Sequence, residues 1–158
     1  IRAAALAAPR VPGLQLWMVG HGHERQRLDD LVKELHAEDL VTFWGERLDV
    51  AGFFSVADVY CMSSTSEGVP MSLLQAMSIG LPAIVTDVGG MAEVVKNAHA
   101  GLATPVGDVE AMAESIVQMA TDEKRRAVFR DNAQTAYGEL FTLEHLDAAY
   151  MELYRRSR

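Results

Sequence analysis

The chain has 158 residues, of which 49% are hydrophobic, and it carries a formal net charge of −8. This length suits one domain with a sizeable core, and the composition excludes a disordered chain. The negative charge repels phosphate backbones, and no apolar run approaches the roughly 18–20 residues of a membrane span, so we expect neither a nucleic-acid-binding nor a membrane-spanning protein.

Short apolar runs alternate with helical patterns over the first two thirds of the chain. In chain order the pattern predicts strand 14–20, helix 24–36, strand 40–45, helix 50–57, strand 58–64, helix 70–79, strand 82–87, helix 89–95 and strand 101–106. Three helices are then predicted without intervening strands, at 108–120, 123–138 and 143–155. Strands that alternate with helices imply a parallel sheet covered on both faces, and the right-handed crossover rule makes this a doubly wound α/β fold. We expect the three terminal helices to pack at one side.

The only cysteine, Cys61, lies within the third predicted strand. It cannot form a disulfide within the chain, and its apolar neighbours in sequence predict a buried side chain. A lone, buried thiol is typical of a reducing compartment, so we expect a cytoplasmic protein.

In doubly wound sheets, ligands bind beyond the carboxyl ends of the strands. The loop after the first strand contains Gly20 and Gly22, which permit a tight turn and a close approach of backbone to a ligand. Arg25 stands where the dinucleotide fingerprint requires a third glycine, so the motif does not indicate an NAD site. His21 and His23 have no partners of ligand spacing, and we expect no metal site. A plain strand-to-helix turn remains the alternative.

The loop after the second strand contains Gly45, Glu46 and Arg47. Gly45 again frees the backbone, and the two charged side chains follow the strand at the edge where a ligand would bind. They could equally be solvated surface charges.

The loop after the third strand leads into the predicted helix 70–79 through Glu67 and Pro70. Proline at a first helical position removes no hydrogen bond, and the next amides, of Met71 and Ser72, point out of the helix start. Together with the helix dipole they form an anion site that suits a phosphate. Glu67 could accept hydrogen bonds from hydroxyls, and Gln75 could reach a group bound near the helix start.

Two other interpretations of this loop stay open. Glu67 could merely interact with the helix dipole from outside, and Gln75 could be a surface amide.

The loop after the fourth strand repeats the pattern, because Gly89 and Gly90 open a helix and could admit a ligand, while Glu93 fits a helix-surface acid. Together the loops suggest a phosphorylated, polyhydroxylated ligand, and a nucleotide sugar fits that description.

The segment SSTSEGVPMSLLQAMSIGLPAIVTDVGGMAEVV, residues 63–95, resembles the donor-binding, C-terminal half of retaining glycosyltransferases of family four, the glycosyl transferases group 1. These enzymes have the GT-B architecture of two facing Rossmann-like domains. The family pattern is E-G-x-x-x-x-L-L-E-A-M-A-x-G-x-P-V-V-A-T, followed by a Gly-Gly helix start that ends in Glu-x-Val. The matching residues are Glu67, Gly68, Leu73, Leu74, Ala76, Met77, Gly80, Pro82, Thr86, Gly89, Gly90, Glu93 and Val95. The order and spacing of the other predicted elements agree over essentially the whole chain.

The resemblance implies roles for the site residues. Glu67 corresponds to the first acid of the family's E-x7-E motif, which contacts hydroxyls of the donor sugar, and it is the expected catalytic residue. Backbone contacts to the sugar and diphosphate are expected from Gly68, Val69, Pro70, Met71 and Ser72. The expected contacts near the nucleotide involve Gly20, Gly22, Gly45, Glu46 and Arg47.

Gln75 departs from the family pattern, since it stands where the second acid of the motif binds the ribose hydroxyls. Hydrogen bonds of a neutral amide contribute about 0.5–1.5 kcal/mol, against about 1.5–3 kcal/mol for a charged group. We therefore expect a lower donor affinity or a changed nucleotide preference.

A second departure lies at the start of the chain. The family's donor domain begins with a strand and a basic Arg–Lys pair that clamps the diphosphate, whereas IRAAALAAPRVPG resembles the tail of the helix that follows that strand. We therefore expect residues 1–158 to be a single Rossmann-like, nucleotide-sugar-binding domain, cut from a two-domain protein without its N-terminal acceptor domain. The central strand of its sheet should be absent, which leaves a gap unless another chain fills it.

In the whole protein, the resemblance implies an enzyme that transfers a sugar from a nucleotide-diphosphate sugar to an acceptor with retention at the anomeric carbon. It implies no metal and no other cofactor, and electrostatic stabilisation of the leaving diphosphate as the main catalytic device. The acceptor, and any peripheral membrane association, would involve the absent half. The alternative is a non-catalytic nucleotide-sugar-binding or regulatory module, which Gln75 and the missing clamp favour. A structural role has only the three terminal helices in its support.

Overall fold

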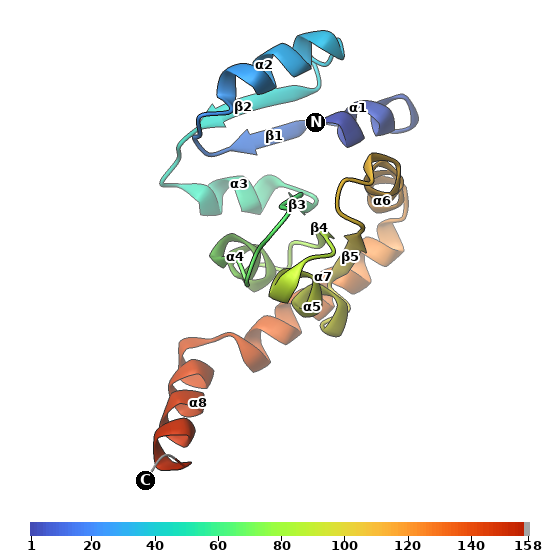
Figure 1. Ribbon diagram of the computed structural model, residues 1–158. Helices are drawn as coiled ribbons and strands as arrows, with labels where there is room; N and C mark the ends of the chain where they lie inside the picture. Colours follow the sequence, from blue (N-terminus) through green and yellow to red (C-terminus); the bar gives the residue numbers. More distant parts are fainter. Residues whose placement is uncertain (157–158) are drawn as a thin grey trace.

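The computed structural model describes residues 1–156 of the chain as strands alternating with helices (Figure 1). The strands are β1 (Leu16–Val19), β2 (Val41–Gly45), β3 (Tyr60–Met62), β4 (Ala83–Thr86) and β5 (Gly101–Thr104). The helices are α1 (Arg2–Ala7), the 3-10 helix η1 (Ala8–Arg10), α2 (Arg25–Glu34), α3 (Val50–Val56), α4 (Met71–Ser78), α5 (Gly89–Asn97), α6 (Val109–Thr121), α7 (Glu123–Leu140) and α8 (Leu143–Arg156). All strand pairings are parallel, which confirms the predicted α/β class.

The strands form two sheets, with the orders β1-β2 and β3-β4-β5. A doubly wound sheet has the strand order 3-2-1-4-5-6, and a sheet without strand 1 would separate into a pair and a triplet. The two sheets therefore agree with the predicted gap, which lies between β1 and β3. The prediction for Cys61 is wrong, because this residue of β3 is exposed rather than buried.

The core is built around β4, whose four residues are all buried between β3 and β5. Because side chains alternate along a strand, Ala83 and Val85 face one side and Ile84 faces the other. The first side packs against buried residues of α4, α5 and α7, which are Leu73, Met77, Met91, Val95, Ala133 and Ala136. The second side packs against α1 and α6 through Ala3, Ala7, Met112, Ala113 and Val117. The sheet is thus covered on both faces, as predicted.

The terminal helices do not pack at one side as expected. Helix α6 covers the face of β4 that carries Ile84, while α7 packs on the opposite face with α4. Asp122 ends α6 and begins α7, so the chain crosses from one face to the other at a single residue. Helix α8 extends away from the rest of the molecule (Figure 1), and its Leu143 and Tyr154 are exposed.

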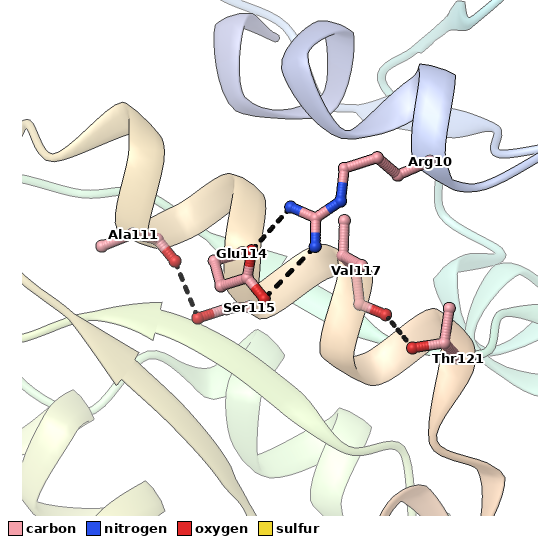
Figure 2. A network of polar contacts seen from close by, with 6 residues as sticks. All are labelled: Arg10, Ala111, Glu114, Ser115, Val117 and Thr121. Atoms are coloured by element: carbon pink, nitrogen blue, oxygen red, sulfur yellow. Dashed lines mark hydrogen bonds and ion pairs between the residues drawn. The ribbon is translucent and has the colours of Figure 1, made fainter.

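Helix α1 links the two parts of the fold on one face. Its Ala3 and Ala7 contact α6, and its Ala4 belongs to the cluster formed with α2, β1 and β2. Figure 2 shows that Arg10 of η1 reaches Glu114 of α6, with 2.6 Å between Nη1 and Oε2. Both side chains are about half exposed, so this ion pair adds little stability, and the buried alanines hold α1 in place.

The hydroxyl groups of α6 bond within the helix. Ser115 and Thr121 each donate to the carbonyl four residues earlier, at 2.9 and 2.8 Å (Figure 2). The buried Ser115 therefore has its hydroxyl satisfied without a partner from another element. In the part of the chain that the structure describes, no helix has the length and apolar character needed to span a membrane.

Candidate functional site

Helix α4 follows the loop at the carboxyl end of β3. Pro70 is extended, with φ −66° and ψ 135°, and acts as the N-cap, so the helix starts at Met71, one residue later than predicted. The amides of Leu73 and Leu74 both donate to the carbonyl of Pro70, at 3.1 and 3.3 Å. The amides of Met71 and Ser72 come before Leu73, the first amide that bonds within the helix, so α4 itself gives them no acceptor, as at any helix start.

Apolar packing fixes the direction of α4. Leu73, Ala76 and Met77 have no exposed surface and face β4 and α7. The opposite side of the helix carries Met71, which is 68% exposed, and Gln75, which is also exposed. The side chain of Gln75 therefore lies about one turn from the helix start with its amide open to solvent.

Glu67 lies half-buried in the loop between β3 and α4. Its Oε1 accepts a hydrogen bond from the hydroxyl of Ser64 at 3.1 Å. The carbonyl of Ser64 in turn accepts from the hydroxyl of Thr86, the last residue of β4. Neither hydroxyl residue was predicted to contact Glu67, although the run of serine and threonine before Glu67 and the threonine at the end of a strand were visible signals.

Tyr60 of β3 contacts the start of α4 through Ser72. Its hydroxyl shares a hydrogen bond with the hydroxyl of Ser72 at 2.8 Å and also donates to the sulfur of Met62 at 3.0 Å. Burial raises the pKa of Tyr60, and the hydrogen bond with Ser72 opposes that shift only in part. Tyr60 therefore stays protonated, and the protein engages the hydroxyl of Ser72.

The loop between β4 and α5 approaches the Glu67 loop rather than open space. Gly89 has φ +49°, and a Cβ at this residue would overlap the carbonyl oxygen of Glu67. A Cβ at Gly90 would lie 2.8 Å from Cγ2 of Val69 and 3.3 Å from the carbonyl oxygen of Gly68. The two glycines therefore allow close packing between two loops, and the approach of a ligand to them stays a prediction. Glu93 is an exposed residue of α5, as predicted.

The loops after β1 and β2 form a second group. The amide of Gly20 donates to the carbonyl of Gly45 at 2.8 Å, which joins the first residue after β1 to the last residue of β2. Gly45 has φ +68°, a conformation that glycine adopts without strain. Gly22 and Glu46 are exposed.

Arg47 is paired within its own loop. Its Nε and Nη2 each donate to a carboxylate oxygen of Asp49 at 2.8 Å, and its guanidinium lies 5.4 Å from the ring centre of Phe53. The hydrogen bonds lower the pKa of Asp49 and raise that of Arg47. Part of the positive charge expected near the nucleotide is therefore already compensated by Asp49.

The predicted site residues fall into these two groups. One group follows the loop into α4 and consists of Glu67, Gly68, Val69, Pro70, Met71 and Ser72, with Gln75 one turn further. Gly20, Gly22, Gly45, Glu46 and Arg47 lie at the carboxyl ends of β1 and β2. In the part of the chain that the structure describes, no backbone hydrogen bond joins the two groups.

The next two observations concern a groove outside these groups and a metal-binding cluster, which the described residues do not form. A groove of about 420 Å³ between α5 and α7, lined by residues such as Asn97 and Asn132, contains none of the predicted site residues. Among residues 1–156, no group of three or more His, Cys, Asp or Glu side chains is arranged to hold a metal ion.

Comparison with known proteins identifies the family. The sequence profile of the family "Glycosyl transferases group 1" matches residues 1–136. The chain is 34% identical over 140 residues to N-acetyl-alpha-D-glucosaminyl L-malate synthase of Bacillus anthracis. The aligned region covers 89% of this chain and 37% of that protein. It is 30% identical over 147 residues to the lipopolysaccharide core biosynthesis glycosyltransferase LpsE of Rhizobium meliloti, which covers 93% and 43%.

Solved structures share the fold. Sucrose-phosphate synthase of Thermosynechococcus elongatus aligns with a TM-score of 0.85 and 29% identity, over 98% of this chain and 41% of that one. The pneumococcal O-GlcNAc transferase GtfA, in complex with UDP and GlcNAc, aligns with a TM-score of 0.84 and 25% identity, over 98% and 32%. The chain thus spans less than half the length of these proteins, and it belongs to the glycosyl transferases group 1.

Proposed function

We propose that this chain is the nucleotide-sugar donor-binding domain of a retaining glycosyltransferase. One observation carries the proposal: the loop that holds the half-buried Glu67 leads into α4, and the first amides of that helix, of Met71 and Ser72, have no partner within it. An anion site and a hydroxyl acceptor that follow one another along the chain match the two ends of a sugar diphosphate. This segment follows the carboxyl end of β3, where ligands of parallel α/β sheets bind.

The diphosphate binds at the start of α4 in this proposal. The amides of Met71 and Ser72 and the positive end of the helix dipole meet the phosphate oxygens. When the bond between the sugar and the diphosphate breaks, negative charge develops on the leaving oxygen, and these fixed donors stabilise it. The acceptor hydroxyl oxygen then bonds to the anomeric carbon on the face that the diphosphate leaves, which retains the configuration, and the hydroxyl proton passes to the leaving phosphate oxygen.

Glu67 binds the sugar. Ser64 donates to Oε1 of the carboxylate, and the described residues provide no hydrogen bond to Oε2, which leaves this oxygen for a sugar hydroxyl. A hydrogen bond to a charged carboxylate is stronger than one between neutral groups. On the nucleotide side, Gln75 accepts from the ribose, while Gly20 and Gly45 let the backbone of their loops approach the nucleotide.

The comparisons support a sugar nucleotide as the ligand class. GtfA, which shares the fold at 25% identity, was solved with UDP and GlcNAc, and several relatives carry names that describe glycosyl transfer. Because the chain spans less than half of the relatives' length, we propose that the acceptor is bound by a facing domain of the complete protein.

The proposal is tested by a thermal-shift panel of UDP-, GDP- and ADP-sugars on the complete protein, run with and without EDTA. A ligand at 100 times its Kd stabilises the native state by about 2.7 kcal/mol. We expect one nucleotide sugar to raise Tm, and we expect EDTA to leave that shift unchanged, because amides rather than a metal meet the diphosphate. A panel without any shift would refute donor binding, and loss of the shift in EDTA would refute the metal-free assignment.

Gln75 provides a test of the ribose assignment. We expect Gln75→Glu to bind the preferred donor about 1 kcal/mol more tightly, because a charged acceptor replaces a neutral one. Titration calorimetry with that donor measures the change. Gln118 is a control, since Gln118→Glu alters an amide on α6 that accepts from Arg125 and should leave donor affinity unchanged. Weaker binding by Gln75→Glu would contradict the contact with ribose.

A non-catalytic binding module is the second candidate, and Gln75 is the observation that favours it. The neutral amide replaces a charged ligand of the donor, which weakens binding without removing it. Release of nucleoside diphosphate with transfer to an acceptor by the complete protein supports the enzyme. Donor binding without any transfer or hydrolysis supports the module.

A further inference from the structure

Glu67 is held by residues that do not themselves face the proposed donor. The carboxylate accepts from the hydroxyl of Ser64, and the carbonyl of Ser64 accepts from the hydroxyl of Thr86. Thr86 is only 3% exposed, so this hydroxyl has no access to a ligand in solution. Two hydrogen bonds therefore link the end of β4 to the acid through Ser64, one to its backbone carbonyl and one from its side-chain hydroxyl.

The backbone of Glu67 is fixed by a second contact from the same direction. Gly89 lies so close to the carbonyl oxygen of Glu67 that any Cβ would overlap it, and φ +49° further disfavours other residues. Gly90 approaches Val69 and the carbonyl of Gly68 in the same way. The double glycine thus allows two loops to pack backbone against backbone, which limits the movement of the segment that carries the acid.

The supporting loop is itself anchored. The amide of Asp87 donates to the carbonyl of Thr104 on β5 at 2.7 Å, and the amide of Val88 donates to the carbonyl of Thr86 at 2.8 Å. Lys96 of α5 pairs with the carboxylate of Asp87 at 2.6 Å. These bonds tie the β4–α5 turn to the central sheet, so Thr86 and Gly89 hold the Glu67 loop against a rigid support.

We propose that Thr86 and Gly89 are positioning residues that orient the carboxylate of Glu67 toward the donor sugar. This rests on the proposed function, because Glu67 is assigned there to the sugar hydroxyls. A carboxylate that binds a hydroxyl needs its free oxygen aimed within hydrogen-bond range, and supporting bonds that lock its rotamer provide that aim. Neither Thr86 nor Gly89 touches the donor, and both act through Glu67.

The test uses the complete protein with two ligands: the nucleotide sugar that gives the largest thermal shift, and the matching nucleoside diphosphate without the sugar. Thr86→Val removes the hydroxyl and keeps a branched side chain, whereas Thr86→Ser keeps the hydroxyl. We expect Thr86→Val to lower the affinity for the nucleotide sugar about tenfold. The affinity for the nucleoside diphosphate should stay within about twofold of the wild-type value. Thr86→Ser should restore most of the affinity. Equal weakening of both ligands would overturn the proposal, because a general structural defect has that effect.

A double-mutant cycle separates action through Glu67 from independent action. If Thr86 works through the acid, Thr86→Val has no further effect on nucleotide-sugar affinity in a Glu67→Ala background, which has no acceptor left to orient, whereas independent effects multiply. Multiplying effects would overturn the proposal. A wild-type protein that binds none of the tested nucleotide sugars would instead refute the proposed function itself, so the two failures are distinguishable.

Gly89→Ala and Gly101→Ala form a matched pair for the backbone contact. Each added Cβ would overlap a backbone carbonyl oxygen, that of Glu67 for Gly89 and that of Ala83 for Gly101. Both variants should lower Tm. Only Gly89→Ala should lower the affinity for the nucleotide sugar more than the affinity for the nucleoside diphosphate. If Gly89→Ala does not fold, the Thr86 variants decide. Equal selectivity in both folded glycine variants would overturn the role of Gly89.

Discussion

Replacing Glu67 by alanine in the complete enzyme should lower kcat/KM about 10²–10³-fold, the range found when one donor or acceptor of transition-state charge is removed. The reason is that Oε2 of this carboxylate has no hydrogen bond from the described residues and is the acceptor that we assign to the sugar. The measurement is the initial rate of nucleoside diphosphate release in the presence of acceptor.

The fold should survive this substitution. Glu67 lies half-buried in a loop, and among the described residues its carboxylate bonds only to the hydroxyl of Ser64, so we expect Tm to change little. Glu93→Ala is the matched control, because it removes an exposed acid from α5 without touching the Glu67 loop. Unchanged activity in Glu67→Ala, or an equal loss in Glu93→Ala, would make Glu67 an ordinary surface acid.

Leu73→Ala should lower the free energy of unfolding by about 2–5 kcal/mol, as for other fully buried leucines. Leu73 has no exposed surface and packs with Met77 and Val85 between α4 and the sheet. The cavity left behind cannot be filled by solvent-exposed neighbours, so the loss includes both transfer and cavity terms. Urea denaturation followed by circular dichroism measures the change.

The same helix provides the control for that measurement. Met71 is 68% exposed, and Met71→Ala should change the unfolding free energy by less than about 0.5 kcal/mol. The substitution keeps the backbone amide that we assign to the diphosphate, so donor affinity should also persist. A loss in Met71→Ala as large as in Leu73→Ala would show that α4 is not anchored through its buried side.

Local patterns were sufficient for much of the candidate site. Pro70 and the apolar spacing that follows it predict a helix start at this point, and the structure differs only in making Pro70 the cap. The apolar residues of α4 are buried and Gln75 is exposed, as the periodicity of the helix requires. The contacts of Glu67 could not be predicted, because Ser64 and Thr86 are brought together by strand pairing.

Long-range packing explains the predictions that were wrong. The sequence of Cys61 and its neighbours is that of a buried strand, yet the residue is exposed on β3, which pairs only with β4. The amphipathic patterns of α6 and α7 predict helices correctly, but each pattern says only that one side is buried. The turn at Asp122 determines which face of the sheet each of the two helices packs against.

The sequence by itself determined the alternation of strands and helices, the parallel α/β class and the loop that carries Glu67, because propensity, periodicity and turn residues act over a few neighbouring positions. Only the tertiary structure decided what surrounds that loop. Gly89 and Gly90 suggested an opening for a ligand, whereas the folded chain places them against the backbone of Glu67 and Gly68. A glycine allows close approach of any backbone, and the partner that approaches is set by the packing of distant segments.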